Sequence, residues 1–448
     1  MSISIQNNLN DQNDKSNLNN QNNPIKLNNF NSFNLPKILL QYISNLNYIT
    51  PTPIQEQTIP LALENHDILG SAQTGTGKTL AFVIPLIANL INNPKSNGLI
   101  LTPTRELAEQ ILAVIQKVLG VKSTIKSALL IGGEPIFKQF KQLKLYPRIL
   151  VGTPGRIIDH LSRKTLHSNF NFLVLDETDR MLDMGFGIQL EKIIHQLPKS
   201  RQTLMFSATL PKHIENLANK YLNNPKRIAI DAINNHISNL KEETIKVQGS
   251  EKFNTLVNQI EQRSGTIIIF VKTKNGAESL SNDLYKKNYK VSYMHGDLKQ
   301  NKRSKVISDF RNGRCQIMVA TDVAARGLDV PHIQHVINYD LPNSPEDYVH
   351  RVGRTARAGA EGSALNLICN HDQAKWTVIQ RFINPEKYPA SKNNFARNDS
   401  AKNDFGVRNN KFKPKFSKFK DHPKSTTFKT GFKTNFKTGF KAKNSNFK

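Results

Sequence analysis

Short apolar runs separated by helix-length segments restrict the folds open to this chain. Six runs between residues 30 and 226 are expected to be strands: Asp67–Ser71, Gly98–Thr102, Ser127–Gly132, Arg148–Gly152, Phe172–Asp176 and Gln202–Ser207. Five more lie between residues 242 and 388: Thr266–Val271, Val291–His295, Gln316–Thr321, His335–Tyr339 and Ser363–Ile368. Strands that alternate with helices form parallel sheets covered on both faces. The pattern predicts two doubly wound α/β domains, 30–226 and 242–388, joined by a linker at 227–241.

The two ends of the chain lack the apolar residues that a core needs. Residues 1–29 hold 11 asparagines. Residues 391–448 carry 14 Lys and 2 Arg against 3 Asp, a net charge of +13, and ten of the 23 phenylalanines. Polar or highly charged segments of this kind cannot offset the entropy cost of folding. We therefore expect a disordered Asn-rich lead at 1–29 and a disordered basic tail at 389–448.

Within the tail, Lys follows each of the regularly spaced residues Phe428, Phe432, Phe436 and Phe440. Lysine neutralises phosphate and phenylalanine stacks on bases, so the leading hypothesis is a tether for single-stranded nucleic acid. An anionic lipid surface is a rival partner, because it also attracts Lys combined with Phe. A solubilising tail without any partner is the third interpretation.

The overall charge and the cysteine usage indicate the class of partner and the compartment. A formal net charge of +27 favours a polyanionic partner. The two cysteines, Cys315 and Cys369, form no short Cys/His cluster at ligand spacing, so neither a structural zinc site nor a disulfide framework is expected. The longest apolar run, Leu80 to Ile91, is too short to span a bilayer. We expect a cytoplasmic protein that does not bind membranes.

A phosphate-binding loop is predicted between the first strand and the helix that follows it. The segment runs Ala72-Gln73-Thr74-Gly75-Thr76-Gly77-Lys78-Thr79. Its glycines allow backbone N–H groups to turn towards phosphates at a helix N-terminus. Lys78 is then expected to reach the terminal phosphates, and the Thr79 hydroxyl to ligate Mg²⁺. A plain Gly/Thr-rich turn is the alternative.

Two carboxylates, Asp176 and Glu177, end the apolar strand Phe172–Leu175. Beside a phosphate loop, Asp176 is expected to hold Mg²⁺ and Glu177 to orient and deprotonate the attacking water. The alternative is a strand end capped by acidic residues.

With these motifs in place, Phe30 to Asn384 resembles a DEAD-box RNA helicase, most similar to the bacterial RhlE-like branch. The resemblance implies two tandem RecA-like domains. It assigns adenine stacking to Tyr48 and adenine-edge reading to Gln55 of Pro51-Thr52-Pro53-Ile54-Gln55. The loop residues Thr74, Gly75, Thr76, Gly77, Lys78 and Thr79 would then bind ATP. Asn47 stands where the family usually has Gly, but Asn tolerates a left-handed backbone well.

The same resemblance implies an RNA path across both halves of the chain. The matching segments are Pro103-Thr104-Arg105-Glu106-Leu107-Ala108, Gly132-Gly133, Thr153-Pro154-Gly155-Arg156, Gln300-x-x-Arg303 and Ala320-Thr321-Asp322. The residues implied to contact RNA are Arg105, Gly133, Thr153, Arg156, Arg303 and Thr321. Guanidinium groups, hydroxyls and exposed glycine N–H groups suit a sugar-phosphate backbone. Taken singly, each segment could be an ordinary turn.

The resemblance also makes the ATP site composite. Asp329 would reach the ribose, and Arg354 and Arg357 of His350-Arg351-Val352-Gly353-Arg354-Thr355-Ala356-Arg357 would act as arginine fingers. A basic, solvated helix start is the alternative. Four residues would couple the ATP state to RNA binding: Asp179, Ser207, Thr209 and His350. Among them, the hydroxyls of Ser207 and Thr209 would contact Asp179.

Two further positions depart from the family pattern. Thr178 replaces Ala in Asp176-Glu177-Thr178-Asp179, which leaves both carboxylates in place. Ala356 stands where Gly is commoner, and little effect is expected there if it lies in a helix.

The activity implied is that of an ATP-dependent RNA helicase that uses ATP and Mg²⁺ and acts on single strands and short duplexes. Two alternatives remain open from the sequence. One is an ATP-regulated RNA clamp whose hydrolysis is dispensable, and the other is a DNA helicase of related fold.

Overall fold

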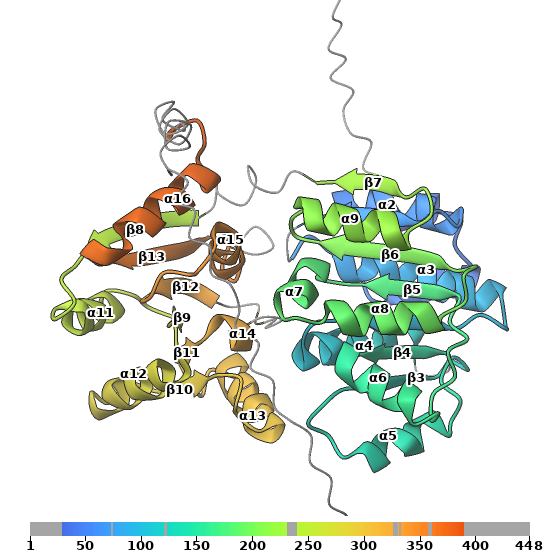
Figure 1. Ribbon diagram of the computed structural model, residues 1–448, viewed down its shortest axis with the longest axis horizontal. Coiled ribbons are helices and arrows are strands. Elements are labelled where there is room, and N and C mark those ends of the chain that lie inside the picture. Colours follow the sequence, from blue (N-terminus) through green and yellow to red (C-terminus); the bar gives the residue numbers. More distant parts are fainter. Residues whose placement is uncertain are drawn as a thin grey trace, which may run out of the picture. The chain divides into compact units, whose positions relative to one another are not determined.

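Two parallel sheets, each covered by helices on both faces, make up the computed structural model (Figure 1). The structure describes residues 29–72, 75–120, 123–230, 240–325, 330, 333–356 and 361–388. The predicted lead at 1–29, apart from Asn29, and the predicted tail at 389–448 lie outside these residues. None of the helices within the described ranges is long and apolar enough to cross a membrane.

The first sheet has seven strands in the order β3-β4-β2-β5-β6-β1-β7. The strands are β1 Ile68–Ser71, β2 Gly98–Leu101, β3 Ser127–Leu130, β4 Ile149–Gly152, β5 Phe172–Leu175, β6 Gln202–Ser207 and β7 Lys226–Ala229. The helices of this domain are η1 Phe30–Ser32, α1 Lys37–Asn45, α2 Pro53–Leu63, α3 Lys78–Asn92, α4 Arg105–Leu119, α5 Ile136–Leu143, α6 Pro154–Ser162, α7 Thr178–Asp183, α8 Gly187–Gln196 and α9 Lys212–Tyr221.

The second sheet has six strands in the order β10-β11-β9-β12-β13-β8. The strands are β8 Leu240–Lys246, β9 Thr266–Phe270, β10 Val291–Met294, β11 Ile317–Ala320, β12 Ile333–Asn338 and β13 Gly362–Ile368. The helices are α11 Lys252–Glu261, α12 Lys274–Lys286, α13 Gln300–Arg311, α14 Asp322–Ala325, α15 Pro345–Val352, η2 Asn370–Asp372 and α16 Gln373–Ile383.

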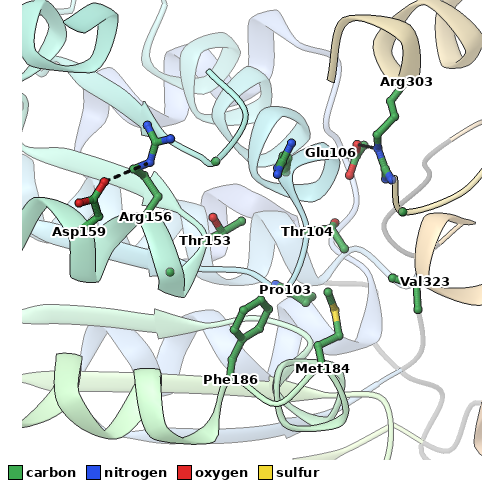
Figure 2. Close-up of a pocket in the computed structure, with 14 residues that line it drawn as sticks. Pro103, Thr104, Glu106, Thr153, Arg156, Asp159, Met184, Phe186, Arg303 and Val323 are labelled. Carbon is green, nitrogen blue, oxygen red and sulfur yellow. Dashed lines mark hydrogen bonds and ion pairs between the residues drawn. The ribbon is translucent and has the colours of Figure 1, made fainter. Parts of the chain in front are cut away.

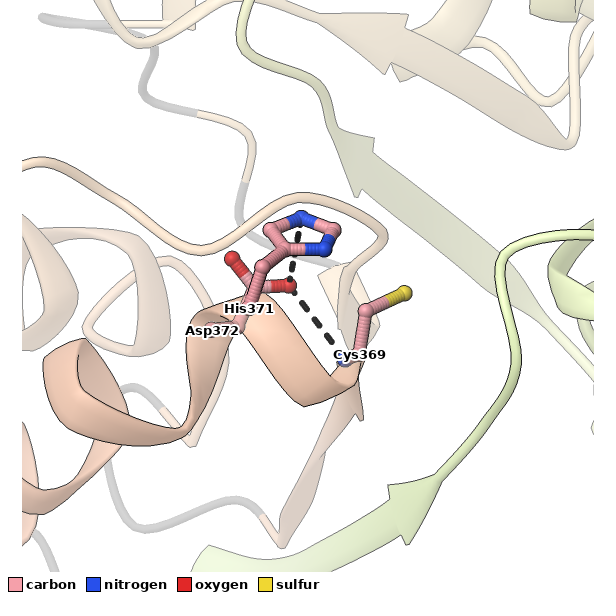
Figure 3. A group of neighbouring side chains, drawn as sticks. All are labelled: Cys369, His371 and Asp372. Carbon is pink, nitrogen blue, oxygen red and sulfur yellow. Dashed lines mark hydrogen bonds and ion pairs between the residues drawn. The ribbon is translucent and has the colours of Figure 1, made fainter.

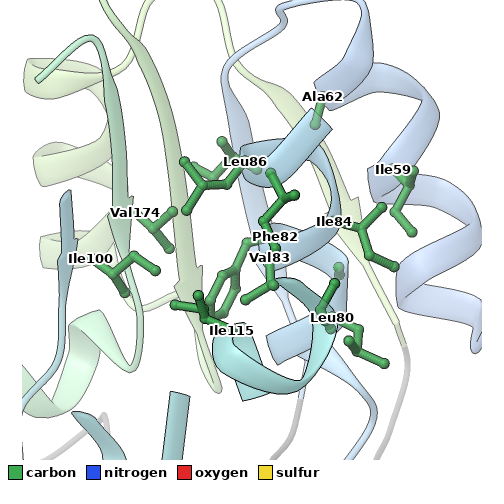
Figure 4. Close-up of a cluster of buried hydrophobic side chains, with 14 of the residues drawn as sticks. Ile59, Ala62, Leu80, Phe82, Val83, Ile84, Leu86, Ile100, Ile115 and Val174 are labelled. Carbon is green, nitrogen blue, oxygen red and sulfur yellow. The ribbon is translucent and has the colours of Figure 1, made fainter. Parts of the chain in front are cut away.

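The strand pleat divides each domain's core between the two faces of its sheet. Along β5, Phe172 and Val174 join one apolar cluster, whereas Leu173 and Leu175 join the other. Figure 4 shows the first cluster, where Val174 lies near Phe82 of α3. Burial on both faces explains why these strands are continuous apolar runs that could be recognised in the sequence.

The eleven predicted strands are all present, with ends that differ by at most two residues. Two further strands, β7 and β8, occupy parts of the predicted linker 227–241 and pair with β1 and β13. Each lies at the edge of its sheet, and most of its side chains are exposed. Such a strand needs few apolar residues, so its sequence resembles a polar linker.

Candidate active site and nucleic-acid interface

The phosphate loop bends through two glycines with left-handed backbones, Gly75 (φ 89°) and Gly77 (φ 92°). A Cβ atom on Gly77 would come within 2.5 Å of Gln55 Nε2, so a side chain there would be both strained and crowded. Helix α3 begins immediately afterwards, at Lys78. The Lys78 Nζ atom is buried and donates to the Ala72 carbonyl at 2.8 Å, across the mouth of the loop. Thr76 and Thr79 are half-buried, and the predicted ligand Thr74 lies outside the described residues.

The predicted adenine reader lies against the same loop. Gln55 is buried, its Nε2 donates to the Gly77 carbonyl at 2.9 Å, and its Oε1 accepts the Thr52 N–H at 3.0 Å. These bonds hold the amide at the start of α2. The Tyr48 side chain is exposed, and Asn47 has a φ of 57°, the left-handed turn that the sequence led us to expect.

The acidic pair stands at the carboxyl end of β5. Burial raises the pKa of Asp176 to about 6, and the nearby Lys78 ammonium opposes that shift. Glu177 has a φ of 49°, and its buried Oε2 atom has no hydrogen-bond partner among the described residues. It forms an ion pair with the buried Arg180, whose Nε lies 3.7 Å from Oε2. Arg180 was not predicted from the sequence.

These groups suit a hydrated magnesium ion. Mg²⁺ prefers oxygen ligands and usually binds one or two carboxylates plus phosphates and water. Asp176 supplies a buried carboxylate, and the Glu177 Oε2 atom, which has no hydrogen-bond partner among the described residues, offers an acceptor for a water molecule beside it. The residues present therefore fit the ion that the phosphate loop implies.

Thr178 is fully buried, and its Oγ1 donates to the Leu175 carbonyl at 3.4 Å. That bond turns the hydroxyl back to the strand, so we expect Thr178→Ala to leave ATP hydrolysis within about tenfold, or about 1.4 kcal/mol in activation free energy. Steady-state ATPase assays with saturating RNA measure this, and Thr178→Val separates the hydroxyl from the side-chain volume. A larger change in either direction would contradict the prediction.

The contact between Asp179 and the Ser207-Ala208-Thr209 segment corrects the sequence prediction in one respect. Asp179 Oδ2 accepts the backbone N–H groups of Ala208 at 3.1 Å and Thr209 at 3.4 Å. The Ser207 hydroxyl instead donates to the Thr209 carbonyl at 2.6 Å. Backbone amides therefore hold the carboxylate, and residue type alone could not reveal this because every non-proline residue carries an N–H.

Four of the six residues predicted to contact RNA line one cavity of about 370 Å³ (Figure 2). They are Arg105, Thr153, Arg156 and Arg303. Gly133 and Thr321 are not among the lining residues. Met184 and Phe186 also line the cavity and were not predicted. They follow α7, where no family motif had drawn attention to them.

Side-chain contacts join the halves of this predicted path. Glu106 Oε1 and Arg303 Nε are 2.7 Å apart, and both side chains are buried. Arg105 donates to Gln300 Oε1 at 3.1 Å. Two of the predicted RNA-contacting arginines, Arg105 and Arg303, are thus bonded to residues of the other domain. Glu106 lies in a segment that resembles the family, but that resemblance did not indicate that it would pair with Arg303.

In the second domain, Arg351 organises the end of α15. Its guanidinium contacts Asp322 Oδ1 and Oδ2 at 2.5 and 2.8 Å, and Asn338 Oδ1 at 2.8 Å. It also lies over the Phe270 ring, 4.8 Å from the centroid. Bidentate pairing of this kind needs the planar fork of arginine. No function had been assigned to Arg351 from the sequence.

Replacing Arg351 with Met is expected to destabilise the second domain by about 3–5 kcal/mol, because it leaves Asp322 without its main cationic partner in a largely buried site. Urea unfolding would measure the loss. The double variant Arg351→Met, Asp322→Asn should be less destabilised than the sum of the single variants. Simple additivity would mean that the pair does not interact as described.

Of the predicted second-domain ATP contacts, only Arg354 is described. It is buried, its Nε donates to the His350 carbonyl at 3.2 Å, and it lines a small cavity of about 10 Å³ with His350 and Arg180. Arg180 belongs to the first domain and pairs with Glu177, so the residue that contacts Glu177 shares this cavity with Arg354, although Asp176 and Glu177 do not line it. Arg357 and Asp329 lie outside the described residues.

Ala356 corrects another expectation. Helix α15 ends at Val352, and Ala356 has a φ of 54° and is buried. The expectation that Ala356 has little effect assumed that it lies in a helix. In a left-handed backbone Gly is favoured instead, because the Cβ atom of any other residue costs about 1–2 kcal/mol in that conformation.

We therefore expect Ala356→Gly to stabilise the second domain by up to about 1 kcal/mol, since part of the relieved strain is offset by greater freedom of the unfolded chain. Chemical denaturation measures the effect. Ala277→Gly within α12 serves as the control and should destabilise the domain by about 1 kcal/mol or more. A clear loss of stability in Ala356→Gly would contradict the strain argument.

The expectation that the cysteines form no short cluster with histidine also needs correction. Cys369, His371 and Asp372 hold potential ligand atoms within 4.8 Å of one another (Figure 3), although no Cys/His cluster was expected. Asp372 accepts the Cys369 N–H at 3.3 Å in a capping box at the start of η2. His371 is largely exposed. The capping box accounts for the proximity of Cys369 and Asp372.

A phosphate loop, an acidic pair at a strand end and two parallel sheets define a nucleoside triphosphatase with tandem RecA-like domains. Residues 52–217 match the DEAD/DEAH box helicase family, and residues 251–359 match the helicase conserved C-terminal domain. The chain is 41% identical over 357 residues to the DEAD-box ATP-dependent RNA helicase CshA of Bacillus subtilis, which covers 79% of this chain and 72% of that protein. The chain belongs to the DEAD-box ATP-dependent RNA helicase family.

Solved structures support the same assignment. Dbp5 of S. cerevisiae bound to RNA and ADP BeF3 matches with a TM-score of 0.73 and 32% identity, over 80% of this chain and 93% of that one. Mss116 bound to ssRNA and UDP-BeF matches with a TM-score of 0.70 and 31% identity, over 79% of this chain and 77% of that one.

Proposed function

We propose that the chain hydrolyses ATP in a pocket built by both domains and uses the cycle to separate or remodel short RNA duplexes. The observation that carries this proposal is the buried Asp176–Glu177 pair, which Arg180 connects to a cavity that Arg354 of the second domain also lines. Phosphoryl transfer depends chiefly on positioning and charge stabilisation, and this arrangement supplies both.

Each residue of the pocket has a proposed role. Lys78 leaves the Ala72 carbonyl to bind the terminal phosphates, and Gln55 reads the adenine edge beside Tyr48. Glu177 orients the attacking water and takes its proton. Arg354, together with Arg357, stabilises the negative charge that develops on the γ-phosphate, and Asp329 binds the ribose.

Mg²⁺ is the proposed metal, held by Asp176 and the Thr79 hydroxyl. When bound, it neutralises phosphate charge and helps to align the γ-phosphate. The Asp176 pKa of about 6 implies that the carboxylate is mostly ionised at neutral pH and takes up a proton as the pH falls below that value.

For RNA we propose a path along the cavity that Arg105, Thr153, Arg156 and Arg303 line, continued by Gly133 and Thr321. The similar Dbp5 and Mss116 structures hold RNA and single-stranded RNA, respectively. RNA can reach Arg105 and Arg303 only if their contacts with Gln300 and Glu106 rearrange. ATP-dependent domain movement would provide this rearrangement.

Two finer assignments are also proposals. The RhlE-like branch rests on the sequence motifs, whereas the relative from Bacillus subtilis is named CshA. A cytoplasmic location rests on the composition and the cysteine usage.

RNA-stimulated ATP hydrolysis tests the proposed function. With Mg²⁺ and single-stranded RNA, the purified chain should hydrolyse ATP much faster than with DNA of the same sequence. Equal stimulation by DNA would favour the alternative of a DNA helicase. Absence of hydrolysis under every condition would contradict the proposal.

A further inference from the structure

Helix α5 and the turn that follows it expose aromatic and basic side chains that the pocket and the RNA path do not use. Phe137 is 73% exposed and Tyr146 is 85% exposed. Lys138, Lys141 and Lys144 are exposed between them. We call these five side chains the α5 surface.

The buried side of α5 fixes the direction in which this surface points. Gln139 is fully buried, its Nε2 donates to the Ile131 carbonyl at 2.8 Å, and its Oε1 lies 3.0 Å from His160 Nε2. Phe140 packs edge-to-face on His160 and also on Phe137, with centroid distances of 5.7 and 5.8 Å. The Phe137 ring is therefore held in place while most of it faces solvent.

The backbone at Tyr146 supports a role for this surface. Its φ of 50° is left-handed, which aromatic residues rarely adopt. Because the Tyr146 ring is exposed, its burial does not offset the energy of this strained backbone. Backbone strain of this kind is commonly found at functional sites.

The charge of the surface has one sign. From Pro135 to Arg148 the sequence contains three lysines and an arginine but no Asp or Glu. Phe137, Lys141 and Lys144 are spaced by four and three residues, so they share one helix face. A run of lysines flanked by exposed rings matches the chemistry of single-stranded nucleic acid.

The α5 surface also continues directly from the proposed RNA path. Helix α5 begins three residues after Gly133. Arg156, which lines the cavity, donates to the Glu134 carbonyl at 3.3 Å and so fixes the connecting loop. Figure 1 shows α5 beside α6 and β3 at one end of the first sheet.

We propose that the α5 surface is a second RNA-binding surface, which holds single-stranded RNA as it leaves the path between the domains. Phe137 and Tyr146 stack on bases, and the three lysines neutralise phosphates. This inference rests on the proposed RNA path. An anionic membrane is less well matched, because the two rings lie at opposite ends of the lysine run rather than together on one insertable apolar face.

RNA length separates this surface from the central path. Affinities of the full chain for 6- and 25-nucleotide oligouridine, measured by fluorescence anisotropy with a non-hydrolysable ATP analogue, provide the test. One variant carries Phe137→Ala and Tyr146→Asn, because Asn accepts the left-handed backbone. A second carries Lys138→Gln, Lys141→Gln and Lys144→Gln. The control carries Tyr285→Ala, Lys286→Gln, Lys287→Gln and Lys290→Gln, which alter an exposed ring and three exposed lysines of the second domain.

Each α5 variant should weaken binding of the 25-mer about tenfold or more and leave the 6-mer within about twofold, since each stacked base contributes substantially. In the lysine variant the slope of log affinity against log salt should fall by about 2 for the 25-mer, because three phosphate contacts are lost. The control should match the wild type.

Unchanged 25-mer affinity would overturn the inference, as would equal losses for both lengths or an equal loss in the control. Reduced binding to anionic vesicles, with RNA binding intact, would also overturn it and indicate a lipid surface. If the wild-type chain bound neither RNA length, the proposed function itself would fail, which is a distinguishable result.

Discussion

The Glu177→Gln variant is expected to lose roughly 10²–10⁴-fold in the rate of RNA-stimulated ATP hydrolysis, because an amide cannot accept the proton of the attacking water. Glu177 is buried at the strand end, and its Oε2 has no hydrogen-bond partner among the described residues. Single-turnover hydrolysis with saturating ATP measures the chemical step.

Two controls accompany this variant. RNA binding with ATP should be retained, because no proposed RNA contact changes. Thermal unfolding must be compared as well, since Gln removes the carboxylate that faces the buried Arg180. A variant that stays folded and hydrolyses ATP within tenfold of the wild type would exclude Glu177 as the base. Full biological activity without hydrolysis would instead support the RNA-clamp alternative.

Replacing Arg354 with Gln is expected to lower kcat by roughly 10³-fold or more, the effect typical of an arginine finger. The residue is buried, bonded to the His350 carbonyl, and shares a cavity with Arg180, which pairs with Glu177. ATP affinity should change little, because the proposed contact strengthens only in the transition state.

Lys in place of Arg354 provides a matched control. It preserves the positive charge but loses the planar donor fork, so it should restore only a small part of the activity. If Gln lowered ATP affinity and left kcat unchanged, Arg354 would be a binding residue and not a finger.

The sequence predicted the parts of the fold that depend on complete burial. Central strands such as β5 are apolar on both faces, and this makes them visible as continuous runs. The edge strands β7 and β8 were missed because their exposed side chains are mostly polar. Their formation depends on pairing with β1 and β13, a long-range contact that local sequence does not encode.

The functional site, like the fold, was predicted only where local sequence determines the structure. Local motifs predicted the phosphate loop and the Asp176–Glu177 pair, because loop, strand end and helix start are adjacent in the chain. Arg180, Glu106 and Arg351 were missed as functional residues, since their partners are fixed only by the tertiary structure. Ala356 was misjudged because the end of α15 leaves it in a left-handed turn, and residue type alone does not give φ.

The central claim is that both domains contribute to one hydrolytic pocket. The most direct measurement compares RNA-stimulated ATP turnover of the whole chain with that of a fragment ending at Ile230, after the first sheet. The composite pocket predicts that the folded fragment binds ATP but hydrolyses it at less than about a hundredth of the full-length rate. A fragment that turned over ATP as fast as the whole chain, with the same dependence on RNA, would contradict the account.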